Sequence, residues 1–576
     1  MRLSLVKSKN TTQFYVIKSY KNKNGKNSTK IVERLGNLEE VSKKCNGEDP
    51  IIWAKKYIDN LNKLEKECSN DIIIKKSQTK TILKDDKNLF NCGYFFLEKI
   101  YNDLNLNNIC KKISMDYKFK FDLNNILSRL IYGRILFPSS KLSLYDLSKN
   151  LLEQPNFKLQ HIYRALEVLK KENSFIQSEL YKNSLKISKR NTGILYYDCT
   201  NYFFEIEEES GSKQYGPSKE HRPNPIVQMG LFMDGNGIPL AFNITPGNMN
   251  EQGTLKPLEQ KILDDFKISK FIVCTDAGLA SNDNRKFNDK KDRAFITTQS
   301  IKKLKKHLQD WIFDTKDWSL SNDTKKYDIS QLEKDEESEN KYYNNVFYKK
   351  RWIKENGLEQ LFIVTYSLKY KKYQQKIRDS QIERARKAIE SKNMKLDKCN
   401  QNDYKRFVKK VDITNDGEIA ENKIYSINTE LIEKEAKFDG FYGVCTNLDE
   451  SVENIIKINQ RRWEIEESFR IMKTEFKARP VYLSRDDRIE AHFITCFIAL
   501  LIYRLLEKKL NEKYTCDEII SCLKEMNLLS VDSDTYIPAY TRTDLTDKLH
   551  EIFGFRTDYE ALSRKKIKNI LKMLKN

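Results

Sequence analysis

The sequence predicts a multidomain α/β protein. In this fold a mixed sheet with flanking helices is preceded by a β-hairpin region and a helical domain, and interrupted by a largely β insertion. Three observations lead to this class. Strand-type apolar runs alternate with amphipathic helical segments in 191–299, helical periodicity fills about 89–190, and a polar, irregular stretch separates the alternating region from one more strand at 439–445. A chain of 576 residues is long enough for several such domains.

The N-terminal region, 1–75, combines a basic hairpin with a helix. Its first 30 residues contain eight Lys or Arg and no acid, and the runs TQFYVIKSY and STKIVERLG flank the turn sequence KNKNGKN. Pro50 then begins the amphipathic helix IIWAKKYIDNLNKLEKE. The hairpin is either an arm that contacts DNA or a solvated hairpin.

Residues 76–190 are predicted to form a helical domain. After a polar linker, apolar residues recur at helical spacing in FFLEKIYNDL, ILSRLIYGRIL and IYRALEVLKK.

Residues 191–299 read as strand, strand, strand, helix, strand, helix, strand. The runs are GILYYDC, IVQMGLFMD, IPLAFNIT, the helix TLKPLEQKILDDF, then KFIVCTD, a short helix and AFITTQ. We assign this region to the first part of a mixed α/β core.

The remaining chain divides into three parts. Residues 300–438 contain β-type runs, a charged helix and three tryptophans, and are predicted to be an insertion domain. Residues 439–515 complete the core with the strand DGFYGVC and a helix that we expect to run from a cap at Asn447 or Asp449 to about Ala478. Residues 516–576 are predicted to form a C-terminal helical region.

The charge balance favours a polyanionic partner. Lys and Arg outnumber Asp and Glu by 103 to 82, a net charge of +21, which favours nucleic acid over a membrane. An AT-rich coding sequence would also enrich Lys and Asn.

The 11 cysteines are scattered without C-x-x-C pairs, so reduced thiols are expected and no structural zinc site is indicated. No signal peptide is recognised, and the longest apolar run is shorter than the roughly 20 residues that span a bilayer, so we expect a cytoplasmic protein with no membrane contact.

Two aspartates follow apolar strand runs directly, Asp198 in ILYYD and Asp276 in FIVCTD. A single aspartate at a strand end is usually a turn former or a helix cap. Two in one sheet, with Glu466 on a helix after the returning strand, suggest convergence instead. Three such carboxylates would repel one another unless a cation neutralised them, and hard oxygen ligands select Mg²⁺ or Mn²⁺. Two ions about 4 Å apart would suit phosphodiester chemistry.

The helix around Glu466 carries charges on one face. Arg462, Glu466 and Lys473 are spaced by four and seven residues, which places them within about 40° of one another around the axis. An ordinary amphipathic helix with an i, i+4 ion pair would show the same pattern. In the functional interpretation Glu466 is the third metal ligand, and Arg462 and Lys473 hold DNA phosphates.

These motifs resemble the DDE transposases of bacterial insertion sequences. The similar branch has a signature in which Tyr, Arg, Glu and Lys are separated by two, three and six residues; Arg462, Glu466 and Lys473 match it, and Asn459 stands at the tyrosine position. Asn459 departs from the signature but can still donate a hydrogen bond to a phosphate. Further similar stretches are YYDCTNYFFE, YGPSKEHRPNPIVQMGLFMDGNGIPLAF, PGNMNEQGTL and CTDAGLAS.

The resemblance implies an RNase H-like core, a helical DNA-binding domain and a catalytic set of Asp198, Asp276 and Glu466 that binds two Mg²⁺ ions. It implies a transposase that binds the terminal inverted repeats of its element as double-stranded DNA, cuts at the ends and joins them to target DNA, working as a homodimer in the synaptic complex.

By the same analogy Lys219 and Arg222 contact DNA, although a solvated loop is an alternative. One tryptophan of the insertion, Trp311, Trp318 or Trp352, could stack on a flipped base or belong to the core. The competing functions are a non-catalytic DNA-binding repressor derived from a transposase and an RNase H-like nuclease without strand joining.

Overall fold

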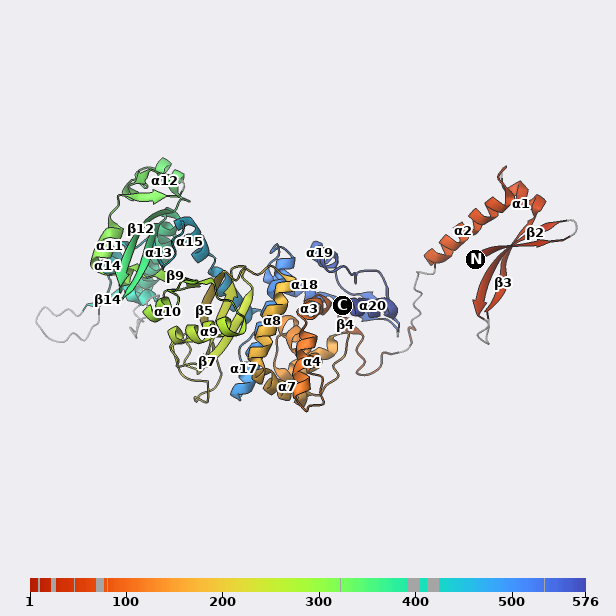
Figure 1. The fold of residues 1–576 in the computed structure, drawn as a ribbon, viewed down its shortest axis with the longest axis horizontal. Coiled ribbons are helices and arrows are strands. Elements are labelled where there is room, and N and C mark those ends of the chain that lie inside the picture. The colour runs from red at the N-terminus through yellow and green to blue at the C-terminus, as the bar shows by residue number, and fades with distance from the viewer. Residues whose placement is uncertain are drawn as a thin grey trace, which may run out of the picture. The chain divides into compact units, whose positions relative to one another are not determined.

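The computed structural model describes residues 1–8, 11–21, 27–45, 47–68, 77–79, 81–321, 323–391, 403–411, 424–532 and 534–575 (Figure 1). The chain forms two compact units. The first contains residues 1–89, 528–539 and 557–569, and the second contains 90–527, 540–556 and 570–576.

The first unit contains the predicted basic hairpin. Strands β2 (Thr12–Lys21) and β3 (Asn27–Asn37) pair antiparallel, and β1 (Arg2–Lys7) adds a third strand to β2 that the sequence pattern did not indicate. Most of the predicted turn lies outside the described residues. The helices α1 (Leu38–Lys44) and α2 (Pro50–Cys68) contribute Val41, Ala54 and Ile58 to a small core with Phe14 and Val16 of β2.

The helical prediction for 76–190 is matched by six α-helices in the second unit. They are α3 (Tyr94–Asp103), α4 (Leu106–Asp116), α5 (Leu123–Leu136), α6 (Lys141–Leu147), α7 (Leu159–Lys171) and α8 (Asn173–Ile187). The apolar helix α17 (Asp486–Lys509) packs against α3, α5 and α7. The length and composition of α17 would allow it to cross a membrane, but 94% of its apolar segment is buried inside the protein. Packing between helices therefore accounts for its apolar surface.

The central sheet has ten strands in the order β11-β10-β12-β13-β16-β9-β8-β5-β6-β7. The predicted succession of elements in 191–299 is confirmed: β5 (Ile194–Phe203), β6 (Ile226–Asp234), β7 (Pro239–Pro246), α9 (Leu255–Asp265), β8 (Phe271–Thr275), α10 (Asn282–Phe287) and β9 (Arg293–Gln299). Strands β5, β6 and β7 pair antiparallel, whereas β5, β8 and β9 pair parallel. The sheet is therefore mixed, as expected.

Residues 300–438 do not build a separate β domain. Strands β10 (Trp318–Leu320), β11 (Lys326–Tyr327), β12 (Phe347–Glu355) and β13 (Leu358–Tyr366) extend the central sheet, because β13 pairs with the returning strand β16 (Phe441–Thr446), which pairs with β9. The same region contains the helices α11 (Lys306–Phe313), α12 (Glu336–Tyr342), α13 (Leu368–Glu390) and α14 (Thr429–Ala436), and the hairpin β14 (Val408–Val411) and β15 (Ile424–Ile427). In the described residues of this segment, more residues lie in α-helices than in strands, so the expectation of a largely β insertion was wrong.

The helix expected after β16 is two helices, α15 (Val452–Gln460) and α16 (Trp463–Thr474). Ser451 caps α15 by accepting a hydrogen bond from Asn454 N–H. The expected cap, Asn447, instead accepts a hydrogen bond from the backbone of Phe295 at 2.9 Å. A tertiary contact thus displaced the local cap, and the chain turns between the two helices at residues 461 and 462.

The C-terminal region contains strands as well as helices. The helices are α18 (Cys516–Glu525), α19 (Asp544–Phe553) and α20 (Arg564–Leu574), and the antiparallel strands are β17 (Asn527–Ser530), β18 (Thr535–Pro538) and β19 (Leu562–Ser563). The prediction of helices alone was incomplete here, because these strands are too short to show a period.

Candidate functional site

The parallel pairing of β5 and β8 places two aspartates side by side. Tyr196 pairs with Cys274 at the end of the shared register, and Asp198 and Asp276 each lie two residues further along their strands. Neighbouring strands run about 4.8 Å apart, so the register brings the two residues next to each other. Asp198 lies within β5 and not after it, because β5 continues to pair with β6 up to Phe203.

Each aspartate also accepts a hydrogen bond from nearby backbone. Cys199 N–H donates to Asp198 Oδ1 at 2.7 Å, and Leu279 N–H donates to Asp276 Oδ1 at 2.9 Å. Burial raises the pKa of Asp198 to about 6; Lys219 lowers it, Asp276 raises it, and Arg462 lowers it. Burial is thus the main cause of the raised pKa of Asp198, and the negative charge of Asp276 adds to it while Lys219 and Arg462 oppose it.

Two lysines expected to contact DNA, Lys219 and Lys473, lie near Asp198. Lys219 donates to the carbonyl oxygen of Cys199 and lies 3.4 Å from the Glu251 carboxylate. Lys473 comes from the C-terminal end of α16, and burial and the charge of Lys219 lower its pKa to about 8, whereas Asp198 raises it. Two lysines and a carboxylate thus share one environment.

Glu220 links Lys473 to a further cation. Lys473 Nζ donates to Glu220 Oε1 at 3.3 Å, and Arg479 forms an ion pair with the same carboxylate. Arg222 is placed differently, because its guanidinium lies 4.2 Å from the centre of the Phe203 ring and its side chain is half exposed. Glu220 and Arg479 were not singled out in the sequence, since only the tertiary contacts connect them to α16.

Arg462 connects Glu466 to the sheet. Its Nη2 donates to Glu466 Oε1 at 3.3 Å, and its Nη1 donates to Thr298 Oγ1 of β9 at 3.1 Å. The side chain of Arg462 is 15% exposed, whereas that of Glu466 is 61% exposed. The predicted i, i+4 pair is therefore present, with its cation buried and its anion facing solvent.

Asn459 is buried and its amide is used inside the protein. Its Nδ2 donates to the Tyr442 hydroxyl at 3.0 Å, and its Oδ1 lies 3.8 Å from the Cys274 thiol. The predicted hydrogen bond from Asn459 to DNA therefore has no support from this geometry. Tyr442 of β16 brings a phenol to the place where Asn459 departs from the signature, and its hydroxyl lies 2.7 Å from Thr298 Oγ1. No local pattern indicates Tyr442, since it precedes Asn459 by 17 residues.

A cavity of about 680 Å³ opens beside Glu466. Tyr370 and Tyr373 of α13 and Trp463 of α16 contribute aromatic side chains to its wall. The tryptophans proposed for base stacking lie elsewhere: Trp318 is buried, and Trp311 packs against Phe362 with ring centres 6.0 Å apart. Trp352, on β12, remains half exposed.

The donor set around Asp198 and Asp276 suits a hard divalent cation. The register places the two residues on neighbouring strands, and carboxylate oxygens are ligands that such a cation prefers. Glu466 is not gathered as tightly, because the three predicted acids do not all lie within 4.8 Å of one another in the described part of the chain. The two aspartates are therefore closer to a shared position than Glu466 is.

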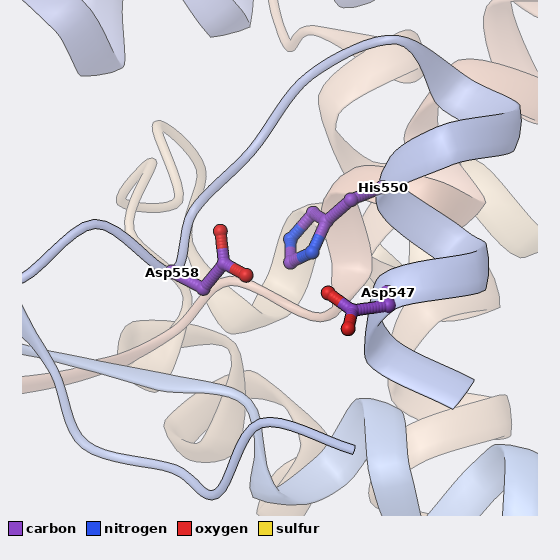
Figure 2. A group of neighbouring side chains, drawn as sticks. All are labelled: Asp547, His550 and Asp558. Atoms are coloured by element: carbon purple, nitrogen blue, oxygen red, sulfur yellow. The ribbon is translucent and has the colours of Figure 1, made fainter. Parts of the chain in front are cut away.

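Figure 2 shows Asp547 and His550 of α19, which also carry side chains of the type that can bind a metal ion. Both residues are far in the sequence from Asp198 and Asp276. Asp547 already accepts hydrogen bonds from Arg542 at 2.8 Å and Arg556 at 2.6 Å. Two guanidinium groups therefore compensate its charge. Asp558, which Figure 2 also labels, is part of the first unit.

These features define an α/β protein with paired carboxylates at neighbouring parallel strands, a site suited to phosphoryl transfer. Residues 203–362 and 358–502 match the transposase DDE domain family model, and together they cover more than half of the chain. The chain therefore belongs to this family and is a transposase. The matched segment includes Asp276 and Glu466 and begins five residues after Asp198.

No curated protein matches the chain. Among solved structures, the piggyBac transposase synaptic complex with hairpin DNA is similar with a TM-score of 0.36 and 9% identity, over 84% of this chain and 85% of that chain. The Mos1 transposase paired-end complex with the left transposon end has a TM-score of 0.12 and 11% identity, over 39% of this chain and 62% of that chain.

Proposed function

We propose that this transposase binds the terminal inverted repeats of an insertion sequence, cleaves the DNA at their ends and joins those ends to target DNA. The observation that carries the proposal is the register of β5 and β8, which places Asp198 beside Asp276. Asp198, Asp276 and Glu466 are the proposed catalytic acids. The order β7-β6-β5-β8-β9, with only β5, β8 and β9 parallel, supports an RNase H-like core.

Mg²⁺ is the proposed cofactor, with Mn²⁺ as a substitute, and the three acids would hold it as a two-ion site. When bound, such ions activate a water or a 3′-hydroxyl and stabilise the leaving oxygen. Asp198 and Asp276 supply adjacent oxygen ligands from strands, whose backbone positions are rigid. Glu466 supplies its carboxylate from a helix and, being exposed, is free to turn toward the aspartates.

The cations around the acids would bind the DNA backbone. Lys473 and Lys219 flank Asp198, and Arg462 is held on β9 through Thr298. Phosphate contacts of this kind position the scissile bond without reading sequence. Arg462 therefore has two roles in the proposal, orienting Glu466 and contacting a phosphate.

Tyr442 is proposed to act as a positioning residue for Arg462. Its hydroxyl lies between the Asn459 amide and Thr298 Oγ1, and Thr298 accepts a hydrogen bond from Arg462. This chain of hydrogen bonds restricts the guanidinium that contacts Glu466. Such a role would compensate for the missing tyrosine of the signature.

The remaining parts of the chain would select the substrate. The basic hairpin β2–β3 and the helices before residue 190 are the proposed end-binding elements. The whole chain has 103 Lys and Arg against 82 Asp and Glu, and this positive net charge favours binding of double-stranded DNA. A homodimer in the synaptic complex would pair two ends, and the cytoplasm is the proposed compartment.

Glu466→Gln tests the function most directly. It keeps the shape of the side chain but removes the charge that a hard cation requires, so cleavage and strand joining should fall by orders of magnitude while end binding persists. The assay measures nicking and joining of DNA that carries the element's ends in Mg²⁺, with Glu467→Gln on the same helix as the matched control.

Normal cleavage by folded Glu466→Gln protein would refute the assignment of this acid. Cleavage without joining by the unaltered protein would favour the nuclease, and end binding without any metal-dependent cleavage would favour the repressor.

A further inference from the structure

A pocket of about 650 Å³ lies in the second unit, apart from the three acids. Its walls are the segment of residues 138–143 at the start of α6, Tyr163 of α7, and the segment between α16 and α17, which contributes Lys477, Arg479 and Tyr482. Among the described residues that line it, none is acidic, whereas serine and tyrosine hydroxyls are frequent. Hydrogen-bond donors and basic groups are therefore frequent in the pocket wall.

Lys141 places a buried ammonium group at this pocket. The residue is 5% exposed, and its Nζ lies 3.3 Å from Nδ1 of His492. The other ring nitrogen, Nε2, lies 2.9 Å from the carbonyl oxygen of Ala478 and therefore carries the proton, so Nδ1 accepts from Lys141. An ammonium group has three N–H donors, and the described part of the chain offers Lys141 no carboxylate.

A second buried cation increases the local positive charge. Arg134 is 3% exposed, and its Nη1 donates to the carbonyl oxygens of Phe476 and Lys477 at 3.0 and 3.1 Å. Its Nη atoms donate to carbonyl groups, which do not neutralise its charge, and its Nε has no hydrogen-bond partner among the described residues. Burial and the charge of Arg134 lower the pKa of Lys141 to about 7, although Cys496 raises it. A buried cation without a counter-charge is costly, so an entering anion would offset this cost.

Arg479 links the pocket to the candidate site through an ion pair. Arg479 lines the pocket and forms an ion pair with Glu220, the carboxylate that Lys473 also contacts. Lys473 in turn lies in the environment of Asp198. Lys473 and Arg479 therefore lie on either side of Glu220, between Asp198 and the pocket that Lys141 lines.

We propose that this pocket binds a phosphate group of the DNA strand that passes through the site, with Lys141, Lys477 and Arg479 as its ligands. The ligand class, a phosphate oxyanion, follows from the donors and the uncompensated charge. Its source, a nucleic acid backbone and not a free phosphate, rests on the proposed function. Lys141 supplies the charge from the interior, and Lys477, which is exposed, supplies it from the rim.

The test measures binding of the full chain to duplex DNA as a function of salt concentration, in EDTA so that no cleavage occurs. Neutralising one phosphate ligand should reduce the slope of log K against log salt by about one unit. Lys477→Gln is the first variant because its side chain is exposed, and Lys141→Met is the second because Met keeps the length of the buried chain. Lys387→Gln on α13, outside the pocket, is the matched control and should keep the slope.

An unchanged slope in folded Lys477→Gln and Lys141→Met proteins would overturn the proposal. A second measurement compares thermal unfolding in inorganic phosphate and in chloride at equal ionic strength. Stabilisation by phosphate that Lys141→Met abolishes supports the anion site. If that stabilisation occurs while the DNA slope is unchanged in both variants, the ligand is a free phosphate and the DNA assignment is overturned.

Failure of the proposed function would look different. Normal cleavage by Glu466→Gln together with a reduced slope in Lys477→Gln would refute the catalytic assignment and leave the phosphate pocket standing.

Discussion

The aspartates and the glutamate of the candidate site are held in opposite ways. Asp198 and Asp276 are positioned by the register of two parallel strands, so their separation is set by the backbone. Glu466 is positioned by its own rotamer on α16 and by one hydrogen bond from Arg462, with most of its side chain in solvent. The positions of the two aspartates are thus set by strand pairing, whereas the Glu466 carboxylate faces solvent and is held by Arg462 alone among the described residues.

This difference indicates how the site would assemble. The sheet provides a fixed receptor for a cation, and the helix provides a ligand that can join or leave without disturbing the core. Substitutions at the two places should therefore have similar consequences for cleavage but different consequences for stability.

The largest effect is expected for Asp198→Asn. Loss of an adjacent metal ligand should reduce cleavage by orders of magnitude. In EDTA the same variant should be more stable at neutral pH, because it removes a carboxylate whose pKa burial raises from 3.8 to about 6. The difference corresponds to at most about 3 kcal/mol in the free energy of unfolding. Urea unfolding of both proteins measures it, and a large loss of stability would show that Asp198 is structural.

The pH dependence of stability should report the burial of Asp198. Since the folded-state pKa of Asp198 lies above the unfolded value, the folded protein binds more protons between about pH 4 and pH 6. Its contribution therefore destabilises the fold as pH rises through this window. The free energy of unfolding, measured in EDTA across these pH values, should fall less steeply in Asp198→Asn than in the unaltered protein. Parallel curves for the two proteins would contradict the raised pKa.

An intermediate effect is expected for Tyr442→Phe. The change removes the hydroxyl between Asn459 and Thr298, so Arg462 and Glu466 should be less well oriented. Groups that orient metal ligands typically contribute about 10- to 100-fold to activity, and we expect cleavage to fall by that order. A buried amide without its partner should cost about 1–3 kcal/mol of stability.

The control for this variant is Tyr373→Phe, an exposed tyrosine on the wall of the cavity beside Glu466. Equal losses of cleavage in the two variants would show that the phenol of Tyr442 has no special role.

The smallest effect is expected for the stability of Glu466→Gln. Its ion pair with Arg462 is exposed on the carboxylate side, and such pairs contribute at most about 1 kcal/mol. Thermal unfolding in EDTA should therefore give nearly the same midpoint for both proteins. Strong destabilisation by Glu466→Gln would instead show that the Arg462–Glu466 ion pair stabilises the fold.

The sequence by itself determined the elements whose signals are local. Short apolar runs of strand type predicted β5 to β9, two β-type runs around a turn sequence predicted the N-terminal hairpin, and apolar spacing predicted the helices before residue 190. The interval of four between Arg462 and Glu466 predicted their ion pair. These signals depend on neighbours within a few turns or one strand, so they can be read without knowing the fold. Most of the candidate acids and cations were found in the same way.

Only the tertiary structure decided how distant segments meet. It placed Asp198 in register with Asp276 and brought Tyr442 to Asn459. It also placed Lys141 of α6 in the same pocket wall as the segment after α16. It also joined β13 to β16, which turned an expected insertion domain into part of the central sheet, and divided one expected helix into two. Strand pairing and burial depend on contacts between residues far apart in the chain, and no local period carries that information.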